Sequence, residues 1–511
     1  MENSIPSSWC QIRVGETGSC ITGNTPSTKD PSNYGGSIPL IKPPQLNNQI
    51  VSVGDESLSE KGAQLARVLP ENSVLVSCIG NLGRTALNTV PVAFNQQINS
   101  IVPNRAVFSK FLFYQVQSTE FRLQLEEKAT ATTISIVNKG NFEKILVKIA
   151  PFNEQKRIVA KIEELFSELD NGIAALKTAR EQLQVYRQAL LKHAFEGKLT
   201  TRWREESVDK LESPEQLLAR IQKEREARYQ QQLEEWESAV KMWETNGKEG
   251  KKPSKPKQLK DWEELKKNVL IKLPIIPDSW AWKKLGFLTT GVEYGTSAKS
   301  SESGLTPVIR MGNLQNGSID WSDLVYTSDL EEIEKYSLRK NDVLFNRTNS
   351  PELVGKTAKY KGERPALFAG YLIRINQIET IVLSNYVNYF LNSHIAKQYG
   401  NSVKTDGVNQ SNINGEKLQN YPFPFCSIEE QSIIVEMLEE KLSLTDASLQ
   451  DIADQLGKAE ALRQSILKKA FSGQLVPQDP NDEPASELLA RIHAEREATK
   501  TKNTKKARKA K

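Results

Sequence analysis

The chain has 511 residues, enough for two to four domains of ordinary size, and its 68 Lys and Arg against 63 Asp and Glu give a formal net charge of +5. A polar amino-terminal stretch and the lack of any apolar run near the ~20 residues of a bilayer span argue against a membrane protein, and we expect a cytoplasmic one. The four cysteines and three histidines have neither disulfide-framework nor zinc-ligand spacing, so we expect reduced thiols and no metal site.

In chain order, residues 1–152 come first. Short β-branched runs such as 73–77 alternate there with Gly, Asn and Pro, which predicts a mixed α/β domain. Residues 153–200 then repeat apolar side chains every seven positions, which predicts a helix of about 44 residues and ~66 Å. Residues 201–272 are highly charged, with a helical stretch, a Gly/Lys/Pro turn at 247–257 and a shorter helix, so we expect a solvated helical hairpin that serves as a connector.

The second half of the chain has the same order of elements. Residues 273–425 resemble the first domain in texture, residues 426–475 again show heptad spacing, and a further helix is predicted over 476–499. Residues 500–511 carry seven Lys or Arg and no acid, so removing them changes the net charge from +5 to −2. We expect this basic tail to be disordered, and either to attract DNA without regard to sequence or to aid solubility. Because the rest of the chain is nearly neutral, we expect it to bind a polyanion through local basic loops and not through its overall charge.

The heptad pattern predicts that the two long helices pair as a coiled coil. The seam residues are Ile162, Leu169, Leu176, Leu183 and Leu190 in the first helix and Val435, Leu442, Leu449 and Leu456 in the second. Gly197 and Gly473 follow the two patterns and are expected to end the helices. The alternative is that each helix packs separately on its own domain.

The sequence is internally duplicated. RQALLKHAFEGKL at 187–199 recurs 276 positions later as RQSILKKAFSGQL at 463–475, and 16 of the 47 positions from 154 to 200 are identical at this offset. Two further matches share an offset of 271: IPSSW at 5–9 with IPDSW at 276–280, and LLARIQKEREA at 217–227 with LLARIHAEREA at 488–498. We therefore expect a pseudo-two-fold molecule in which each copy runs start motif, domain, long helix, second helix.

The common catalytic motifs are missing from this sequence. Gly355-Lys356-Thr357 resembles the end of a phosphate-binding loop, but Ser350 stands where that motif needs its first glycine. Pro43-Pro44 stands between Lys42 and Gln45, which is not the polar-Pro-Pro-aromatic tetrapeptide of amino-methyltransferases. We therefore expect no catalytic residue in this chain.

Several motifs together resemble one protein family. They are the two IPxSW starts, the Glu-Gln pairs that follow Pro-Phe at 151–155 and 424–431, the helix ends YRQALLKHAFEGKLT and LRQSILKKAFSGQL, and Thr201-Arg202-Trp203-Arg204 after the first. With the duplication, the chain looks like the specificity subunit of a type I restriction-modification enzyme. The resemblance spans essentially the whole chain, and the charged insert at 205–272 is its least diagnostic part.

The resemblance implies an α+β fold with two mixed α/β target recognition domains joined by a pair of long antiparallel coiled-coil helices. Each domain would read one half of a bipartite double-stranded DNA target around an unread spacer. Adenine methylation would belong to two modification subunits with S-adenosylmethionine, and cleavage to restriction subunits with ATP and Mg²⁺, while this chain would bind no cofactor and no membrane. The alternative is a coiled-coil scaffold whose two domains bind proteins or other ligands.

Polar residues in loops are the candidates for reading bases. Arg or Lys suits guanine and Asn or Gln suits adenine in the major groove. The predicted DNA-binding residues are Asn81, Arg84, Thr85, Gln96, Gln97 and Arg105 in the first domain, and Arg310, Asn313, Arg347, Asn349, Lys356, Lys404, Asn409 and Gln410 in the second. Gly83-Arg84-Thr85-Ala86 and Gly355-Lys356-Thr357-Ala358 follow comparable strands and form a weak internal match. For each residue, a turn or a phosphate contact is the alternative.

Overall fold

The computed structural model describes residues 5–130, 134–250, 252–256, 260–492 and 494. The chain forms two compact units. Unit 1 contains Met1–Thr178 and Asp451–Lys511, and unit 2 contains Ala179–Gln450. The predicted basic tail at 500–511 and the end of the predicted helix at 476–499 lie outside the described residues; within that helix, residues 485–492 are helical.

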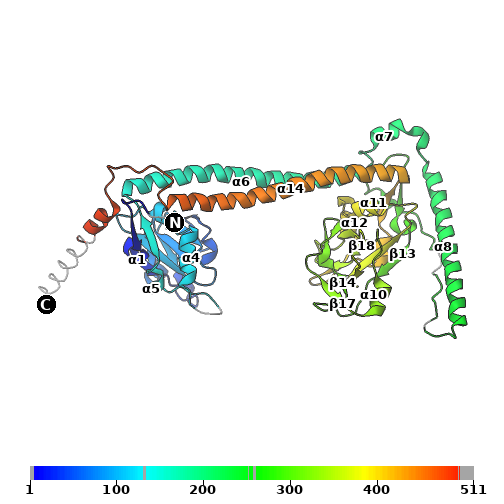
Figure 1. Cartoon of the computed structure of the whole chain (residues 1–511), viewed down its shortest axis with the longest axis horizontal. Helices are drawn as coiled ribbons and strands as arrows, with labels where there is room; N and C mark the ends of the chain where they lie inside the picture. The colour runs from blue at the N-terminus through cyan, green and yellow to red at the C-terminus, as the bar shows by residue number, and fades with distance from the viewer. Residues whose placement is uncertain (1–4, 131–133, 251, 257–259, 493, 495–511) are drawn as a thin grey trace. The chain divides into compact units, whose positions relative to one another are not determined.

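Two long helices contribute to both units. They are α6 (Phe152–Phe195) and α14 (Ile428–Ala470). In unit 1, Asp170 of α6 forms an ion pair with Arg463 of α14, and in unit 2, Arg187 of α6 pairs with Asp446 of α14. The partner's number falls as the residue number in α6 rises, so the helices are antiparallel. Figure 1 shows α6 and α14 side by side in each unit, and the fold class predicted from the sequence is confirmed.

The predicted seam residues face away from solvent. Ile162, Leu190, Val435 and Leu442 are buried, and the other five are half-buried. The buried members lie toward the ends of the helices, where the domains add their own apolar side chains to the core. Gly197 and Gly473 have φ of +71° and +73°, the left-handed conformation of a glycine that ends a helix, as the sequence predicts.

The domain of unit 1 is built from two sheets and a short strand pair. β1 (Cys10–Arg13) pairs antiparallel with β11 (Leu146–Ile149) and so joins the two ends of the domain beside the start of α6. The central sheet has the order β2 (Gly18–Thr22), β10 (Ile98–Pro103), β7 (Val74–Ser77), β8 (Thr85–Asn88) and β4 (Gln49–Val51). The second sheet has the order β5 (Glu56–Leu58), β3 (Tyr34–Ile41), β9 (Val92–Phe94) and β6 (Val68–Leu69).

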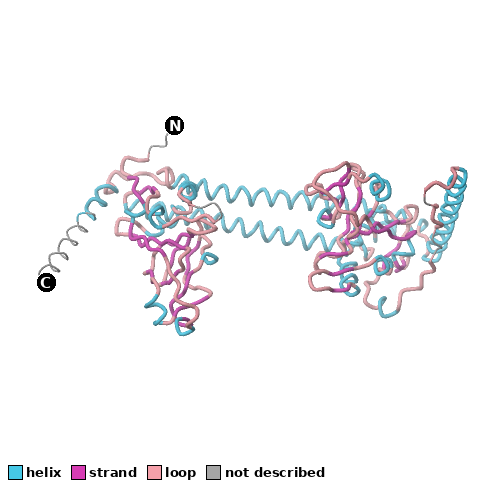
Figure 2. Tube along the Cα trace, turned by 90° about the horizontal axis from the view of Figure 1, so that it is seen from below, coloured by secondary structure: helices cyan, strands magenta, loops and turns pink. Residues whose placement is uncertain are grey.

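The domain of unit 2 repeats the strand pair and four strands of the central sheet, although its sequence barely matches and no strand there corresponds to β4. β12 (Ala281–Lys284) pairs with β25 (Pro422–Phe425) as β1 pairs with β11. The central sheet has the order β13 (Thr289–Tyr294), β22 (Leu372–Gln377), β18 (Val343–Asn346) and β20 (Thr357–Lys359). Its strands correspond in order to β2, β10, β7 and β8. Figure 2 shows the strands of each unit, in magenta, clustered together.

Two helices in each domain cover the sheet and pack on the helix pair. They are α3 (Ser109–Gln115) and α4 (Thr119–Glu127) in unit 1, and α11 (Ser384–Leu391) and α12 (His394–Val403) in unit 2. The Phe111 ring lies 5.2 Å from Phe471, at the end of α14, and the Tyr386 ring lies 5.1 Å from Phe195, at the end of α6. Equivalent aromatic contacts therefore fix each domain to one helix end.

The segments that follow the long helices close the two cores. After α6, Leu217 and Ile221 of α8 (Pro214–Thr245) are buried in unit 2. After α14, Leu489 and Ile492 are buried in unit 1 in the same manner. Unit 1 therefore needs both ends of the described chain.

The connector differs from the predicted helical hairpin. Its first arm is α8, preceded by the short α7 (Thr201–Glu206), but the predicted second helix is only α9 (Lys267–Leu270). The described residues of the return before α9, 252–256 and 260–266, contain no helix, and the Trp236 indole of α8 donates a hydrogen bond to the Pro253 carbonyl. Pro253 and Pro256 disfavour a helix at 252–256 because proline cannot sit inside a helix without losing a hydrogen bond.

Candidate nucleic-acid interface

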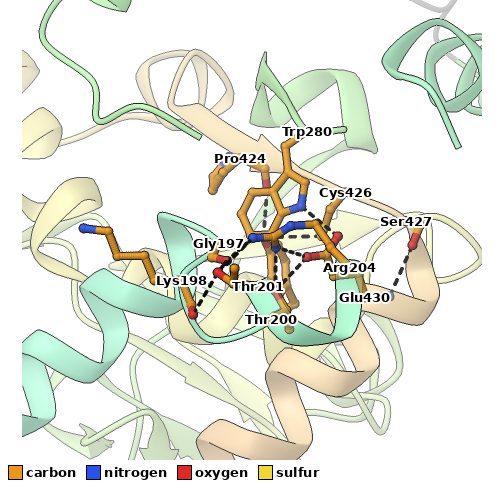
Figure 3. A network of polar contacts seen from close by, with 11 residues as sticks. Gly197, Lys198, Thr200, Thr201, Arg204, Trp280, Pro424, Cys426, Ser427 and Glu430 are labelled. Carbon is orange, nitrogen blue, oxygen red and sulfur yellow. Dashed lines mark hydrogen bonds and ion pairs between the residues drawn. The ribbon is translucent and has the colours of Figure 1, made fainter. Parts of the chain in front are cut away.

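A buried carboxylate holds the second domain on its helix (Figure 3). Glu430, in the first turn of α14, is 1% exposed and accepts a hydrogen bond of 2.8 Å from the Trp280 indole. Arg204 Nη1 lies 2.5 Å from its other oxygen, which also accepts from the Thr200 hydroxyl at 2.7 Å. The charge is therefore both neutralised and fully hydrogen-bonded, as a buried charge must be.

The first domain repeats this contact with one difference. Glu154 in α6 is also 1% exposed and accepts from the Trp9 indole at 3.0 Å. Its second partner is the neutral Gln478 amide, at 2.6 Å, in place of an arginine. Burial raises the pKa of Glu154, although the hydrogen bonds from Trp9 and Gln478 oppose the shift. The tryptophans of the two IPxSW motifs thus have the same task in both units.

The glutamines that follow these carboxylates fix the helices of the domains. Gln155 accepts from the Phe108 amide and donates to the Ala106 carbonyl, just before α3. Gln431 accepts from the Leu383 amide and donates to the Ile381 carbonyl, just before α11. The Glu-Gln pair therefore positions each domain, and no described contact gives it a role in reading DNA.

Unit 2 brings five of the predicted residues into one small sheet. The sheet consists of β19 (Thr348–Asn349), β24 (Ser411–Asn412) and β23 (Thr405–Asp406). Arg347 and Asn349 lie at β19, Lys404 precedes β23, and Asn409 and Gln410 lie in the exposed turn between β23 and β24. Residues from segments more than 50 positions apart are thus gathered at one three-stranded sheet.

These five residues differ in how free their side chains are. The Arg347 guanidinium stacks over the Tyr294 ring at 4.8 Å and donates to the Gly370 carbonyl. Lys404 Nζ donates to the Pro351 carbonyl, and the Asn349 side chain accepts from the Ser350 amide. Asn409 and Gln410 are exposed, beside the fully exposed Val408. The tip of the hairpin is the part that is free to meet a base.

The other three predicted residues of unit 2 lie elsewhere. Asn313 is buried, and its side chain is used within its own turn, where it donates to the Asp320 and Asp323 carbonyls. This corrects the prediction for Asn313, because that side chain is not available to a base edge. Arg310 forms an ion pair of 2.9 Å with Asp323, and Lys356 lies beside the helix pair.

In unit 1, the turn between β7 and β8 presents Asn81 and Arg84 to solvent. Gly80 and Gly83 give this turn its shape with φ of +74° and +78°. Thr85 is buried, and its hydroxyl donates to Asn48, which corrects the prediction for Thr85. Gln96 and Arg105 are exposed on other loops, and Gln97 is half-buried with its side chain accepting from Asn95.

Sequence reasoning missed a set of β-bridges in unit 1 that corresponds to the three-stranded sheet of unit 2. Thr130 pairs with Ile136, and Ile136 pairs with Ile79, as β23 pairs with β24 and β24 with β19. Residues 131–133 between them lie outside the described part. The signal was present in the spacing, because Thr130 and Ile136 lie 275 positions before Thr405 and Ser411.

Two exposed cations on helices were not among the predicted DNA-binding residues. They are Arg122 on α4 and Lys397 on the corresponding helix α12. Among the described residues, no cluster of three or more His, Cys, Asp or Glu has the arrangement of a metal site. The helices in the same part of the chain include none long and apolar enough to cross a membrane.

Comparison with known proteins agrees with this architecture. The family model described as the type I restriction modification DNA specificity domain matches twice, at residues 6–178 and 286–457. The EcoKI specificity subunit of Escherichia coli K12 is 24% identical over 520 residues, covering 97% of both chains. The StySPI specificity subunit of Salmonella potsdam is 22% identical and covers 98% of both.

A solved structure shows the same fold. It was determined in work on complex assembly and conformational transition of the type I R-M system, and it covers 92% of this chain and 99% of its own with a TM-score of 0.63. Its sequence identity of 17% limits the likeness to the fold. The duplicated anchors, the paired helices and the two family matches give one conclusion: the chain belongs to the type I restriction-modification specificity family, as a subunit with two DNA specificity domains.

Proposed function

We propose that this chain selects a bipartite target in double-stranded DNA, with one short block read by each domain and an unread spacer between the blocks. The observation that carries the proposal is that the contacts attaching a domain to its long helix occur twice, once in each unit. Trp9 with Glu154 and Trp280 with Glu430 attach two domains of the same topology to two equivalent helix ends. Two equivalent readers match the approximate two-fold symmetry of a duplex.

The exposed hairpin of unit 2 is the proposed base-reading element. A two-stranded β-ribbon fits the major groove, and the Asn409 and Gln410 amides can each make paired hydrogen bonds to adenine. Arg347, held over Tyr294, lies at the base of the ribbon and can reach guanine or a phosphate. In unit 1, Asn81 occupies the corresponding turn, which follows Ile79 and its bridge to Ile136.

The chemistry is proposed to belong to partner subunits. Two modification subunits would methylate adenines with S-adenosylmethionine, and restriction subunits would use ATP and Mg²⁺ for translocation and cleavage. The chain itself would contribute sequence choice and would act in the cytoplasm. The missing catalytic motifs in the sequence support this division of labour.

Mapping methylated adenines in DNA from cells that carry the intact system tests the proposal. We expect methylation only within a motif of two short blocks separated by a spacer of fixed length. The double variant Asn409→Ala/Gln410→Ala should change or relax one block and leave the other unchanged. The matched control Asn401→Ala/Gln398→Ala, on exposed positions of α12, should leave both blocks unchanged. A single uninterrupted motif would contradict the proposal.

A further inference from the structure

Unit 2 contains a cationic cavity where its domain meets the helix pair. The cavity has a volume of about 110 Å³. Its lining includes Arg187 of α6, Lys356 before β20, Lys397 of α12, Tyr389 of α11 and Asn316. Five separate parts of the chain therefore converge on one small space, and three of the lining side chains are cations.

The positive charge of this cavity is only partly neutralised. Arg187 forms an ion pair with Asp446. Lys356 Nζ donates to the neutral Gln315 side chain at 2.9 Å, and within the described part of the chain neither Lys356 nor Lys397 forms an ion pair. Partial burial and the nearby Lys356 and Arg187 lower the pKa of Lys397. Two cations held together without a carboxylate favour an anion between them.

The helix that carries Lys397 adds to this field. Ser393 caps α12 by accepting from the Ala396 amide, and Lys397 stands in the first turn of the helix. The positive end of the α12 dipole therefore lies next to the lysine, in a helix of 10 residues. Asn392, directly before the cap, also lines the cavity.

Unit 1 has the same pair of positions. Arg84 follows Gly83 between β7 and β8 as Lys356 follows Gly355 between β18 and β20, and Arg122 lies in α4 at the position that Lys397 has in α12. The caps of these helices correspond too, since Ser118 accepts from the Phe121 amide. A Cβ placed on Gly83 would lie 3.7 Å from Arg122 Cγ, so the Arg122 stem runs beside the turn that bears Arg84. Here Arg122 is paired with Glu126, 2.9 Å away.

We infer that each unit holds a phosphate of the DNA backbone between these two cations, Lys356 and Lys397 in unit 2 and Arg84 and Arg122 in unit 1. The recurrence of both positions in domains whose sequences barely match indicates that the pair has a common task. A common task fits a phosphate, which is the same in every sequence, whereas base contacts must differ between two half-sites. The inference rests on the DNA binding that the proposed function assigns to this chain. It assigns Lys356 and Arg84 to the backbone and leaves base reading to the hairpins.

The salt dependence of DNA binding tests this inference. The full chain, in the complex in which it is purified, is titrated onto a fluorescent duplex of arbitrary sequence at several salt concentrations. Each phosphate contact contributes about 0.9 to the slope of log K against log salt concentration. We expect Lys356→Gln/Lys397→Gln to reduce the slope by about 0.9, and the addition of Arg84→Gln to reduce it by about 1.8 in total. Lys361→Gln, an exposed lysine that does not line the cavity, should change neither slope nor affinity.

Two further measurements separate the possible outcomes. Lys397→Arg keeps the charge and should retain the wild-type slope, and equal unfolding temperatures show that the variants are folded. The methylated motif, mapped in cells, should be the same for wild type and variants. An unchanged slope in the triple variant overturns the inference while the proposed function stands. A reduced slope without a bipartite motif overturns the proposed function alone, and a wild-type complex that binds no duplex overturns both.

Discussion

At the scale of single residues, the two anchoring carboxylates are equivalent in position and different in charge balance. Glu430 is neutralised by Arg204, whereas Glu154 has only the neutral Trp9 and Gln478 as partners. The stability that Glu430 gives to unit 2 should therefore depend on its ion pair with Arg204, whereas the stability that Glu154 gives to unit 1 should depend on pH. Each can be tested separately.

Removing the arginine should destabilise unit 2. Arg204→Ala leaves the Glu430 carboxylate buried without its counter-charge, and breaking a buried ion pair in this way costs about 3 to 5 kcal/mol. The control is Arg202→Ala in the same helix, where the exposed pair with Glu206 is worth about 0 to 1 kcal/mol. Urea unfolding followed by circular dichroism measures both. A loss of less than about 1 kcal/mol in Arg204→Ala would show that water replaces the arginine.

Replacing the unbalanced carboxylate should change the pH dependence of stability. The pKa of Glu154 is raised above its ordinary value of 4.5, so its contribution to stability is complete below about pH 4.5 and is lost as pH rises through the raised folded pKa. Glu154→Gln cannot ionise; its amide oxygen can still accept from the Trp9 indole, while the hydrogen bond from the Gln478 amide is lost unless Gln478 turns its own oxygen toward the new amide. The unfolding temperature of the variant minus that of wild type should therefore increase with pH. Glu168→Gln, on an exposed part of α6, should give a difference that is flat with pH.

At the scale of elements, the long helices are continuous from one domain contact to the next. The ion pairs Asp170 with Arg463 and Arg187 with Asp446 occupy equivalent positions, 276 residues apart in both members. Each pair joins α6 to α14 through an exposed aspartate and a half-buried arginine. The helices therefore have one register, and their length should set the spacing of the half-sites.

Lengthening both helices should lengthen the spacer. Duplicating residues 176–182 in α6 and 449–455 in α14 adds seven residues to each helix, about 10.5 Å, and preserves the heptad seam. We expect the unread spacer to grow by about three base pairs at 3.4 Å each, while the two blocks stay the same. Mapping of methylated adenines reads out both. An unchanged spacer would contradict the idea that helix length sets the distance between the half-sites. A control insertion of five residues, which turns the seam by about 140°, should abolish methylation.

The sequence predicted the elements well and the site only in part. Heptads and the terminal glycines Gly197 and Gly473 place both long helices because their signals are local and repeated. Strands β23 and β24 have two residues each, too few for an alternating pattern, so the hairpin was predicted only as a polar loop. The predictions of DNA contact for Thr85 and Asn313 were wrong because both side chains are used inside the domain. Thr85 bonds to Asn48, which is distant in sequence, and Asn313 bonds to the backbone carbonyl of Asp320; residue type alone reveals neither partner. Arg122 and Lys397 were missed because they lie on helices.

At the scale of the whole molecule, charge is distributed unevenly along the chain. The last twelve residues hold seven cations, while the remainder has a net charge of −2. Deleting residues 500–511 should therefore flatten the salt dependence of DNA binding and leave the methylated motif unchanged, because a basic tail attracts phosphates without reading bases. A tail of equal length with its cations replaced by glutamine is the control and should behave like the deletion. A changed motif would show that the tail contributes to recognition.

The closure of unit 1 by Leu489 and Ile492 determines when each part of the protein can fold during synthesis. Unit 2 is one uninterrupted stretch, whereas the domain of unit 1 lacks part of its core until residues 451–492 have been synthesised. The usual order, in which amino-terminal domains finish folding first, is reversed. A chain truncated after residue 450 would retain all of unit 2 and lack the residues that close the core of unit 1, so its loss of structure should be confined to unit 1.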